Sequence, residues 1–177
     1  MIALVFDTET TSLLNNSKLP LDQQPHLIEY YGQLVNDKGK VLQRCELICD
    51  PGVVITKEIT AITGLSAKDV KGRPAFKAVA DQVLEIIGGA DAVVAHNLSF
   101  DYAIINLEFQ RLGIDVEWPV KRICTVQESE WYKGRRLKLA ELHEHLFGEP
   151  FSGAHRARQD VEALTRCYLA MRKRGDL

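Results

Sequence analysis

The sequence predicts an α/β fold, in which a five-stranded mixed sheet is flanked by helices. Short apolar runs of strand length alternate with segments of helical periodicity, in the order of three strands, helices, a strand, a helix, a strand and further helices. The 177 residues suit one domain, 1–177, and no Pro-rich or Gly-rich linker divides them. The composition, with 46% hydrophobic and 26% charged residues, is that of an ordinary soluble domain.

Five segments have the composition of strands: residues 2–6, 27–36, 40–48, 91–95 and 120–124. The second and third are joined by Asn36-Asp37-Lys38-Gly39, which is typical of a hairpin turn, so we expect the first three strands to be antiparallel. A helix lies between the fourth and fifth strands. Because such a crossover brings two strands into the same direction, we expect these two to be parallel.

Helical periodicity and end signals predict helices in five further segments: residues 56–64, 74–89, 99–113, 137–148 and from about 152–157 to 174. Thr56 and Ser99 are candidate N-caps, because their side chains can accept a hydrogen bond from the first helical turn. Between the first two strands, residues 14–26 are polar and contain Pro20 and Pro25. We therefore expect them to form a loop.

Charge and composition exclude several classes of protein. The net charge of -2 rules out a uniformly basic nucleic-acid coat, although the 12 basic and 8 acidic residues of segment 121–177 contrast with 10 basic and 16 acidic residues before it. No apolar run approaches the length of a membrane span, and the N-terminus lacks the basic region of a signal peptide. The four cysteines form no CxxC pair, which argues against zinc and predicts free buried thiols in a reducing cytoplasm.

Three polar segments occur where strands or helices of this plan begin or end. Asp7-Thr8-Glu9-Thr10 follows the first apolar run, and its two carboxylates would share one face of a strand. His96-Asn97-Leu98-Ser99-Phe100-Asp101 joins the fourth strand to a helix, and His155-Arg156-Ala157-Arg158-Gln159-Asp160 opens the last helix. Like charges this close are unfavourable unless a cation lies between them. Taken alone, each segment has a plainer interpretation as a solvated acidic strand end, a carboxylate at a helix N-terminus, or surface charge.

Together, D-T-E-T, H-N-x-x-F-D and H-x-x-x-x-D resemble the DEDDh group of 3′→5′ exonucleases, which includes epsilon-type proofreading exonucleases. The resemblance extends from residue 2 to about residue 170, and the segments Ile62–Leu65 and Leu137–Leu142 also look like that family's intermediate motifs. It implies the ribonuclease H-like exonuclease fold. The implied activity is metal-dependent hydrolysis of nucleic acid from its 3′ end, with release of nucleoside monophosphates.

The resemblance also implies a role for each motif residue. Hard cations such as Mg²⁺ or Mn²⁺ prefer carboxylate oxygens, and two of them about 4 Å apart can activate water and stabilise the leaving oxygen. Asp7 should bridge both ions, Glu9 and Asp160 should help to hold the ion that binds the attacking water, and Asp101 should hold the second ion. His155 should be the general base, and it must be neutral to accept a proton.

Predicted substrate contacts follow from the same resemblance. Leu13 should wedge against the terminal bases, the backbone near Thr10 and Thr11 should bind the 3′-hydroxyl, and Asn97 and Phe100 should contact the terminal nucleotides. The basic residues are candidates for phosphate contacts: Lys133, Arg135, Arg136, Lys138, Arg156 and Arg158. Plain packing is the alternative for Leu13 and Phe100, and a solvated basic surface is the alternative for the cations.

The chain departs from the family pattern in places. Ser12 stands where the family usually has Gly, the loop 14–26 is longer than usual, and the sequence ends just after the last helix, so no polymerase-binding tail is evident. We expect single-stranded or frayed 3′ ends as substrates, with DNA favoured over RNA, in the cytoplasm and without membrane association. The oligomeric state is not predicted.

Other interpretations of the same residues remain open at this point. An exoribonuclease of the same fold is the nearest alternative. A non-catalytic nucleic-acid-binding module would be expected to lose at least one of the acids, yet all are present. An oxygenase centre built on His96, Asp101 and His155 would leave Asp7 and Glu9 unexplained.

Overall fold

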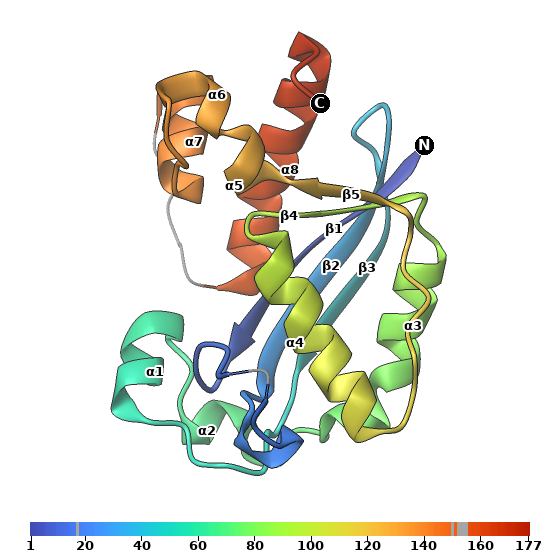
Figure 1. Cartoon of the computed structure of the whole chain (residues 1–177), viewed down its shortest axis with the longest axis vertical. Coiled ribbons are helices and arrows are strands. Elements are labelled where there is room, and N and C mark those ends of the chain that lie inside the picture. The colour runs from blue at the N-terminus through green and yellow to red at the C-terminus, as the bar shows by residue number, and fades with distance from the viewer. Residues whose placement is uncertain (17, 150, 152–155) are drawn as a thin grey trace.

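The computed structural model describes residues 1–16, 18–149, 151 and 156–177. Its centre is a five-stranded sheet in the order β3-β2-β1-β4-β5 (Figure 1). The strands are β1 (Ile2–Thr10), β2 (Leu27–Asn36), β3 (Val41–Ile48), β4 (Ala92–Ala95) and β5 (Lys121–Cys124). The first three are antiparallel, whereas β4 runs parallel to β1 and β5 parallel to β4. The predicted mixed sheet is therefore confirmed.

Helices cover both faces of this sheet. The α-helices are α1 (Lys57–Thr63), α2 (Ala67–Val70), α3 (Ala80–Gly88), α4 (Leu98–Arg111), α5 (Thr125–Glu128), α6 (Glu130–Lys133), α7 (Leu139–Phe147) and α8 (Ala157–Arg174). Two 3₁₀ turns, η1 (Leu21–Gln23) and η2 (Phe76–Ala78), complete the order. In Figure 1, α3 and α4 lie on the near side of the sheet and α8 crosses behind it.

The alternation of side chains along β1 divides the core into two layers. Leu4 and Phe6 pack with the apolar faces of α3 and α4, including Ile86 and Ile104. Their neighbours Ala3 and Val5 point the other way and pack with Val161 and Leu164 of α8. All four strand side chains are buried, which fits a central strand covered on both faces.

The first strand ends later in the sequence than predicted. The apolar run stops at Phe6, but antiparallel pairing with β2 continues through Glu9 and, after a shift in register, brings Thr10 opposite Leu27. The predicted bounds of this strand, 2–6, are therefore too short, and Asp7 and Glu9 lie within it, on one face as their spacing predicted. On the other side, β4 pairs with β1 only over Ala3–Val5. The edge of β1 that carries the acidic residues is thus left beside the start of α4.

Two helix starts also differ from their predictions. The segment 74–89 is not one helix, since the short η2 turn and the non-helical Val79 precede α3. Tertiary packing accounts for this break, because Phe76 is buried edge-on against Phe109 with ring centroids 5.1 Å apart. The N-cap of α4 is Asn97, and Ser99 instead lies in the first turn. Thr56 does cap α1, accepting a hydrogen bond from the Ile59 amide.

The last helix begins at Ala157, within the predicted interval, and ends at Arg174 before Gly175. The residues 152–155, which the prediction placed near its start, lie outside the described part of the chain. Among the residues that the structure describes, no helix is both long and apolar enough to span a bilayer.

Candidate active site

Three carboxylates converge on the face of β1 that α8 covers. Asp7 and Glu9 share that face because they are two residues apart on the strand, and Asp160 lies in the first turn of α8. Carboxylate oxygens of the three residues lie within 4.8 Å of one another. All three are half-buried, so the group is in contact with solvent yet partly shielded from it. The structure thus brings together residues that are up to 153 positions apart in the sequence.

The fourth predicted acid, Asp101, approaches from the edge of the strand. It lies in the first turn of α4 and is buried. Its Oδ1 accepts hydrogen bonds from the Thr8 amide at 3.0 Å and from the Thr8 hydroxyl at 2.7 Å. Because the pairing of β4 with β1 stops at Val5, the Thr8 amide lies beyond β4 and is available to Asp101. Thr8 therefore fixes Asp101 beside the other three acids, a role that the sequence analysis missed.

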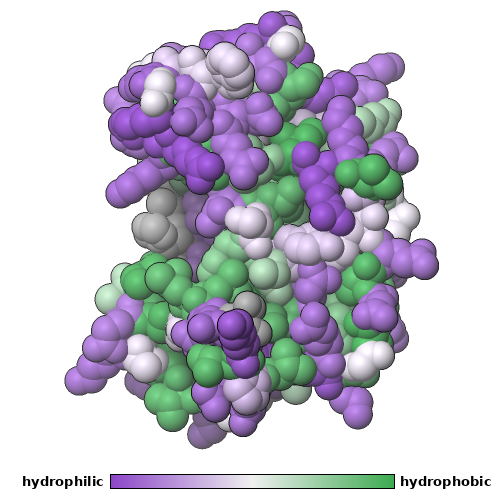
Figure 2. Space-filling model, viewed as in Figure 1, coloured by the Kyte–Doolittle hydropathy of each residue, from purple (hydrophilic) through white to green (hydrophobic). Residues whose placement is uncertain are grey.

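These acids form the floor of a cleft of about 680 Å³. Asn97 and Phe100, at the junction of β4 and α4, also line it. So do Arg136 and Lys138, which precede α7, and Phe151. In the space-filling view, hydrophilic side chains gather over α6 and α7 at the upper left, while hydrophobic and hydrophilic side chains are mixed around α1 at the lower left (Figure 2).

Burial and mutual repulsion raise the pKa values of the clustered acids. Burial is the main cause for Asp7, whose pKa is raised well above its usual value, and the charges of Asp101, Glu9 and Asp160 add to it. Burial, followed by Asp160, raises the pKa of Glu9 to about 8. Burial also raises the pKa of Asp101 to about 7, against the opposing hydrogen bonds from Thr8. The raised pKa values mean that the folded protein favours neutralising this negative charge, either by binding protons or by binding cations.

The donor set fits a hard divalent cation. Carboxylate oxygens are the ligands that Mg²⁺ and Mn²⁺ prefer, and the three clustered acids supply no sulfur or imidazole ligand. His96 lines the same cleft, but its Nδ1 lies 2.9 Å from the Thr125 hydroxyl and its Nε2 lies 3.0 Å from the Leu137 carbonyl oxygen. With both nitrogens engaged and its pKa lowered to about 4 by burial, His96 acts as a neutral structural link. This placement disfavours an oxygenase centre that uses His96 as a ligand.

The predicted general base, His155, lies outside the described residues, so its role stays a prediction. The other predicted contacts are distributed over the cleft and its surroundings. Thr10 is buried, and its hydroxyl donates to the Ser12 carbonyl oxygen at 2.7 Å. Leu13 is 78% exposed just beyond it. Arg135, in contrast, is engaged by Glu141 at 2.6 Å.

An ion pair between a buried glutamate and a half-buried arginine lies beside the acidic cluster. Glu29 of β2 is directly opposite Glu9 in the strand register and is only 1% exposed. Its two carboxylate oxygens accept hydrogen bonds from Arg156, at 2.8 and 3.2 Å, and from the Ala157 amide at 3.1 Å. Glu29 therefore fixes the N-terminus of α8, one turn before Asp160. The sequence analysis did not identify Glu29, although it is the one carboxylate within the predicted strand 27–36.

The topology and the four acids together define the class of protein. A mixed sheet in this order, with carboxylates from its central strand and from two helices meeting in one cleft, is the plan of ribonuclease H-like nucleases. The comparisons agree. The nuclease domain of 3'hExo, described as a DEDDh family member bound to rAMP, superposes with a TM-score of 0.76 over 98% of this chain and 92% of that one, at 15% identity.

The chain belongs to the exonuclease family, whose RNase_T model matches residues 4–168. It is 30% identical over 168 residues to the PolC-type DNA polymerase III of Caldanaerobacter subterraneus subsp. tengcongensis, covering 95% of this chain but 11% of that protein. It is 27% identical to the DNA polymerase III subunit epsilon of Haemophilus influenzae, covering 95% of this chain and 66% of the relative. The family implies dependence on a divalent metal, and the described residues include an acidic cluster whose oxygens are close enough to share one.

The raised pKa of Glu9 predicts how stability depends on pH. The unfolded chain releases this proton near the ordinary value of 4.5, whereas the folded protein without metal holds it up to about 8. The folded state binds more protons between these values, so the free energy of unfolding should fall as pH rises from about 4.5 to about 8. Urea unfolding in EDTA across this range measures the slope. Saturating Mg²⁺ or the Glu9→Gln substitution should flatten it; an equally steep fall in Glu9→Gln would contradict the assignment.

The Glu29–Arg156 pair predicts a large loss of stability on substitution. Glu29→Ala removes the acceptor of the half-buried Arg156 guanidinium and of the first amide of α8, and losing such charge-assisted hydrogen bonds costs about 2 kcal/mol. The matched control is Arg158→Ala, which breaks an exposed pair with Glu162 and should cost about 0.5 kcal/mol or less. Urea unfolding of both variants provides the comparison. Equal losses in the free energy of unfolding would show that the Glu29–Arg156 pair contributes no more to stability than the exposed pair.

Proposed function

We propose that the chain hydrolyses phosphodiester bonds of DNA from the 3′ end, acting on single-stranded or frayed ends and releasing nucleoside monophosphates. The observation that carries the proposal is the convergence of four acids, Asp7, Glu9, Asp101 and Asp160, on the floor of one open cleft. Family membership supports exonuclease activity of the 3′→5′ DEDDh type. The DNA polymerase III relatives favour DNA, although the chain spans only 11% of the first of them.

The proposed site would hold two Mg²⁺ or Mn²⁺ ions. Asp7 would contribute to holding both ions, Glu9 and Asp160 would help to hold the ion that binds the attacking water, and Asp101 would help to hold the second ion through water. Divalent ions held there would supply the activation of water and the stabilisation of the leaving 3′ oxygen. The proximity of the Asp7, Glu9 and Asp160 oxygens, within 4.8 Å of one another, supports a shared ion at these three acids.

His155 would accept the proton of the attacking water. It precedes α8 by two residues, and the next residue, Arg156, is fixed to β2 by Glu29. A general base must be neutral to act, and nearby cations oppose protonation of an imidazole. Bound cations would therefore help to keep His155 in the neutral form that a general base requires.

The substrate would lie along the cleft with its phosphates toward Arg136 and Lys138. These two cations line the cleft just before α7, and Asn97 and Phe100 line the same cleft. Phe100 is partly exposed there and offers a face on which a terminal base can stack. Leu13 would separate the last bases, with the Thr10 and Thr11 backbone at the 3′-hydroxyl. Arg135 and Arg156 would act farther from the scissile bond, since both are engaged by carboxylates.

The four cysteines support a cytoplasmic setting for this reaction. Cys45, Cys49, Cys124 and Cys167 are all free and buried in the described structure. Free thiols persist in reducing compartments.

The metal site is tested by substituting Asp7 and His155 separately. Asp7→Ala should abolish degradation of a 3′-labelled oligonucleotide and also Mn²⁺ binding measured by calorimetry, because the bridging carboxylate is lost. His155→Ala should lower turnover by about a hundredfold or more while leaving Mn²⁺ binding intact, since general bases contribute typically 10²–10⁴-fold. Normal degradation by Asp7→Ala would overturn the whole assignment.

Substrate class is tested in the same assay with matched oligonucleotides. The proposal expects laddering from the 3′ end of single-stranded DNA with Mg²⁺, none with EDTA, and none when the 3′ end is blocked. Faster cleavage of the matched RNA would favour an exoribonuclease. Binding without any cleavage would favour a non-catalytic module.

The contribution of the basic wall is tested by salt dependence. Arg136→Ala should weaken binding of a 3′-blocked oligonucleotide and reduce the slope of log affinity against log salt by about 0.7, the value for one phosphate contact on a single strand. The control is Arg122→Ala, whose exposed side chain contacts Tyr102 and does not line the cleft. An unchanged slope in Arg136→Ala would remove this residue from the phosphate path.

A further inference from the structure

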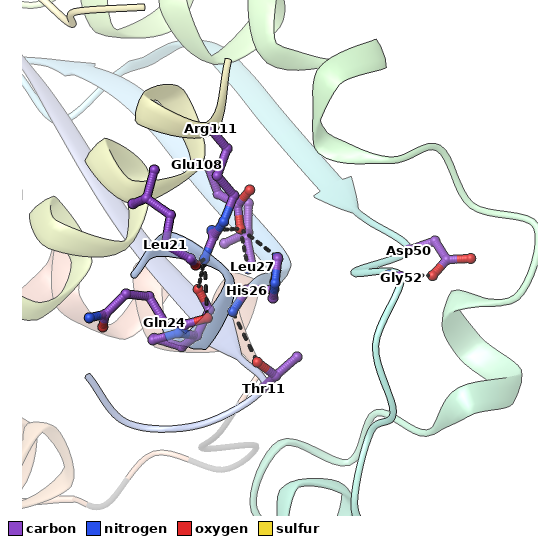
Figure 3. Close-up of polar contacts among 10 residues, drawn as sticks. Thr11, Leu21, Gln24, His26, Leu27, Asp50, Gly52, Glu108 and Arg111 are labelled. Carbon is purple, nitrogen blue, oxygen red and sulfur yellow. Dashed lines mark hydrogen bonds and ion pairs between the residues drawn. The ribbon is translucent and has the colours of Figure 1, made fainter. Parts of the chain in front are cut away.

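We propose that Glu108 and Arg111 of α4 are positioning residues for substrate binding, because they fix the loop that carries Leu13. The proposal rests on the proposed function, and nothing in the family motifs points to these two residues. Neither lines the active-site cleft. They lie at the C-terminal end of α4, where the loop between β1 and β2 returns to the sheet (Figure 3).

The guanidinium of Arg111 binds the part of the loop that leads into β2. Its Nη2 donates to three backbone carbonyl oxygens, those of Leu21 at 2.8 Å, Gln24 at 3.1 Å and Pro25 at 3.0 Å. Its Nη1 donates to Glu108 at 2.9 Å. The Arg111 side chain is only 16% exposed, so these are shielded, charge-assisted contacts. Lysine could not reproduce them, since it lacks the planar fork.

Glu108 connects this arginine to the start of the second strand. Its side chain is 7% exposed, and the oxygen that pairs with Arg111 also accepts the Leu27 amide at 2.8 Å. One residue earlier, His26 closes the loop at its base: its amide donates to the Thr11 hydroxyl at 2.9 Å, and its carbonyl oxygen accepts the Thr11 amide at 3.0 Å. Thr11 directly follows the strand that carries Asp7 and Glu9, so the clamp and the metal site share one strand end.

Polar contacts inside the loop extend this restraint toward Leu13. The Gln24 side chain, which is buried, donates to the Asn16 carbonyl oxygen at 2.9 Å. The Asn15 side chain donates to the Gln23 carbonyl oxygen at 2.6 Å. The part of the loop that follows β1, at Asn15 and Asn16, is thus hydrogen-bonded to the part before β2 that Arg111 binds. Leu13, by contrast, is 78% exposed and belongs to none of the hydrophobic clusters that the described residues form.

A preformed loop binds with less loss of conformational entropy than a mobile one. We therefore expect the clamp to favour binding of substrates long enough to reach Leu13, and to have little effect on the chemistry at Asp7 and Glu9. Arg111→Lys should raise the KM for a single-stranded oligonucleotide about tenfold, a change of about 1.4 kcal/mol. Turnover of a small substrate, the 4-nitrophenyl ester of thymidine 5′-monophosphate, should change less than twofold.

The matched control is Arg174→Lys. Arg174 also donates to a backbone carbonyl oxygen, that of Leu146 at 3.1 Å, but at the far end of α8. It should leave the oligonucleotide KM unchanged. Because Glu108→Gln keeps an acceptor for the Leu27 amide while removing the charge, it serves as a second clamp variant if Arg111→Lys is poorly folded.

A double-mutant cycle with Leu13→Ala tests the connection itself. If the clamp acts through Leu13, Arg111→Lys should have little further effect on KM in the Leu13→Ala background. Tryptic cleavage after Lys18, in the same loop, provides a readout without substrate and should be faster in Arg111→Lys than in Arg174→Lys. Faster cleavage with an unchanged KM, or additive effects of the two substitutions, would reject the positioning role. If the wild-type chain cleaved the small ester and no oligonucleotide, the proposed function would fail instead.

Discussion

The repulsion between carboxylates gathered at one end of β1 is the constraint on which the rest of the site depends. Asp7, Glu9 and Asp160 have oxygens within 4.8 Å of one another, and burial denies them the full screening of water. Such an arrangement persists only where surrounding contacts hold each acid in place. Thr8 does so for Asp101 through two hydrogen bonds, and Glu29 does so for the helix that bears Asp160.

The same constraint explains why a carboxylate that binds no metal lies so near the cluster. Glu29 adds negative charge beside Glu9, yet both of its oxygens are occupied by Arg156 and the Ala157 amide. Its charge is therefore compensated locally by a cation that cannot be deprotonated under ordinary conditions. Glu29 therefore adds little to the repulsion among the acids that line the cleft.

The sequence predicted the mixed sheet from local patterns, whereas the four acids were singled out by the resemblance of three motifs to a known family. Apolar runs of strand length located all five strands, and the two-residue spacing of Asp7 and Glu9 placed them on one face. It could not predict that β1 would continue past Phe6, since that pairing is decided by the partner strand β2. Nor could it connect Glu29 with Arg156 or Glu108 with Leu27, because these contacts span 127 and 81 residues and have no periodic signal.

The short pairing between β4 and β1 has a consequence for association between chains. Beyond Val5, the edge of β1 faces the cleft, and an uncovered strand edge is a template on which a strand of another molecule can add. Asp101 occupies the Thr8 amide of this edge, and the neighbouring carboxylates surround it with negative charge. The acids of the cleft therefore also give this interrupted edge a negative charge, which disfavours the addition of a strand from another molecule.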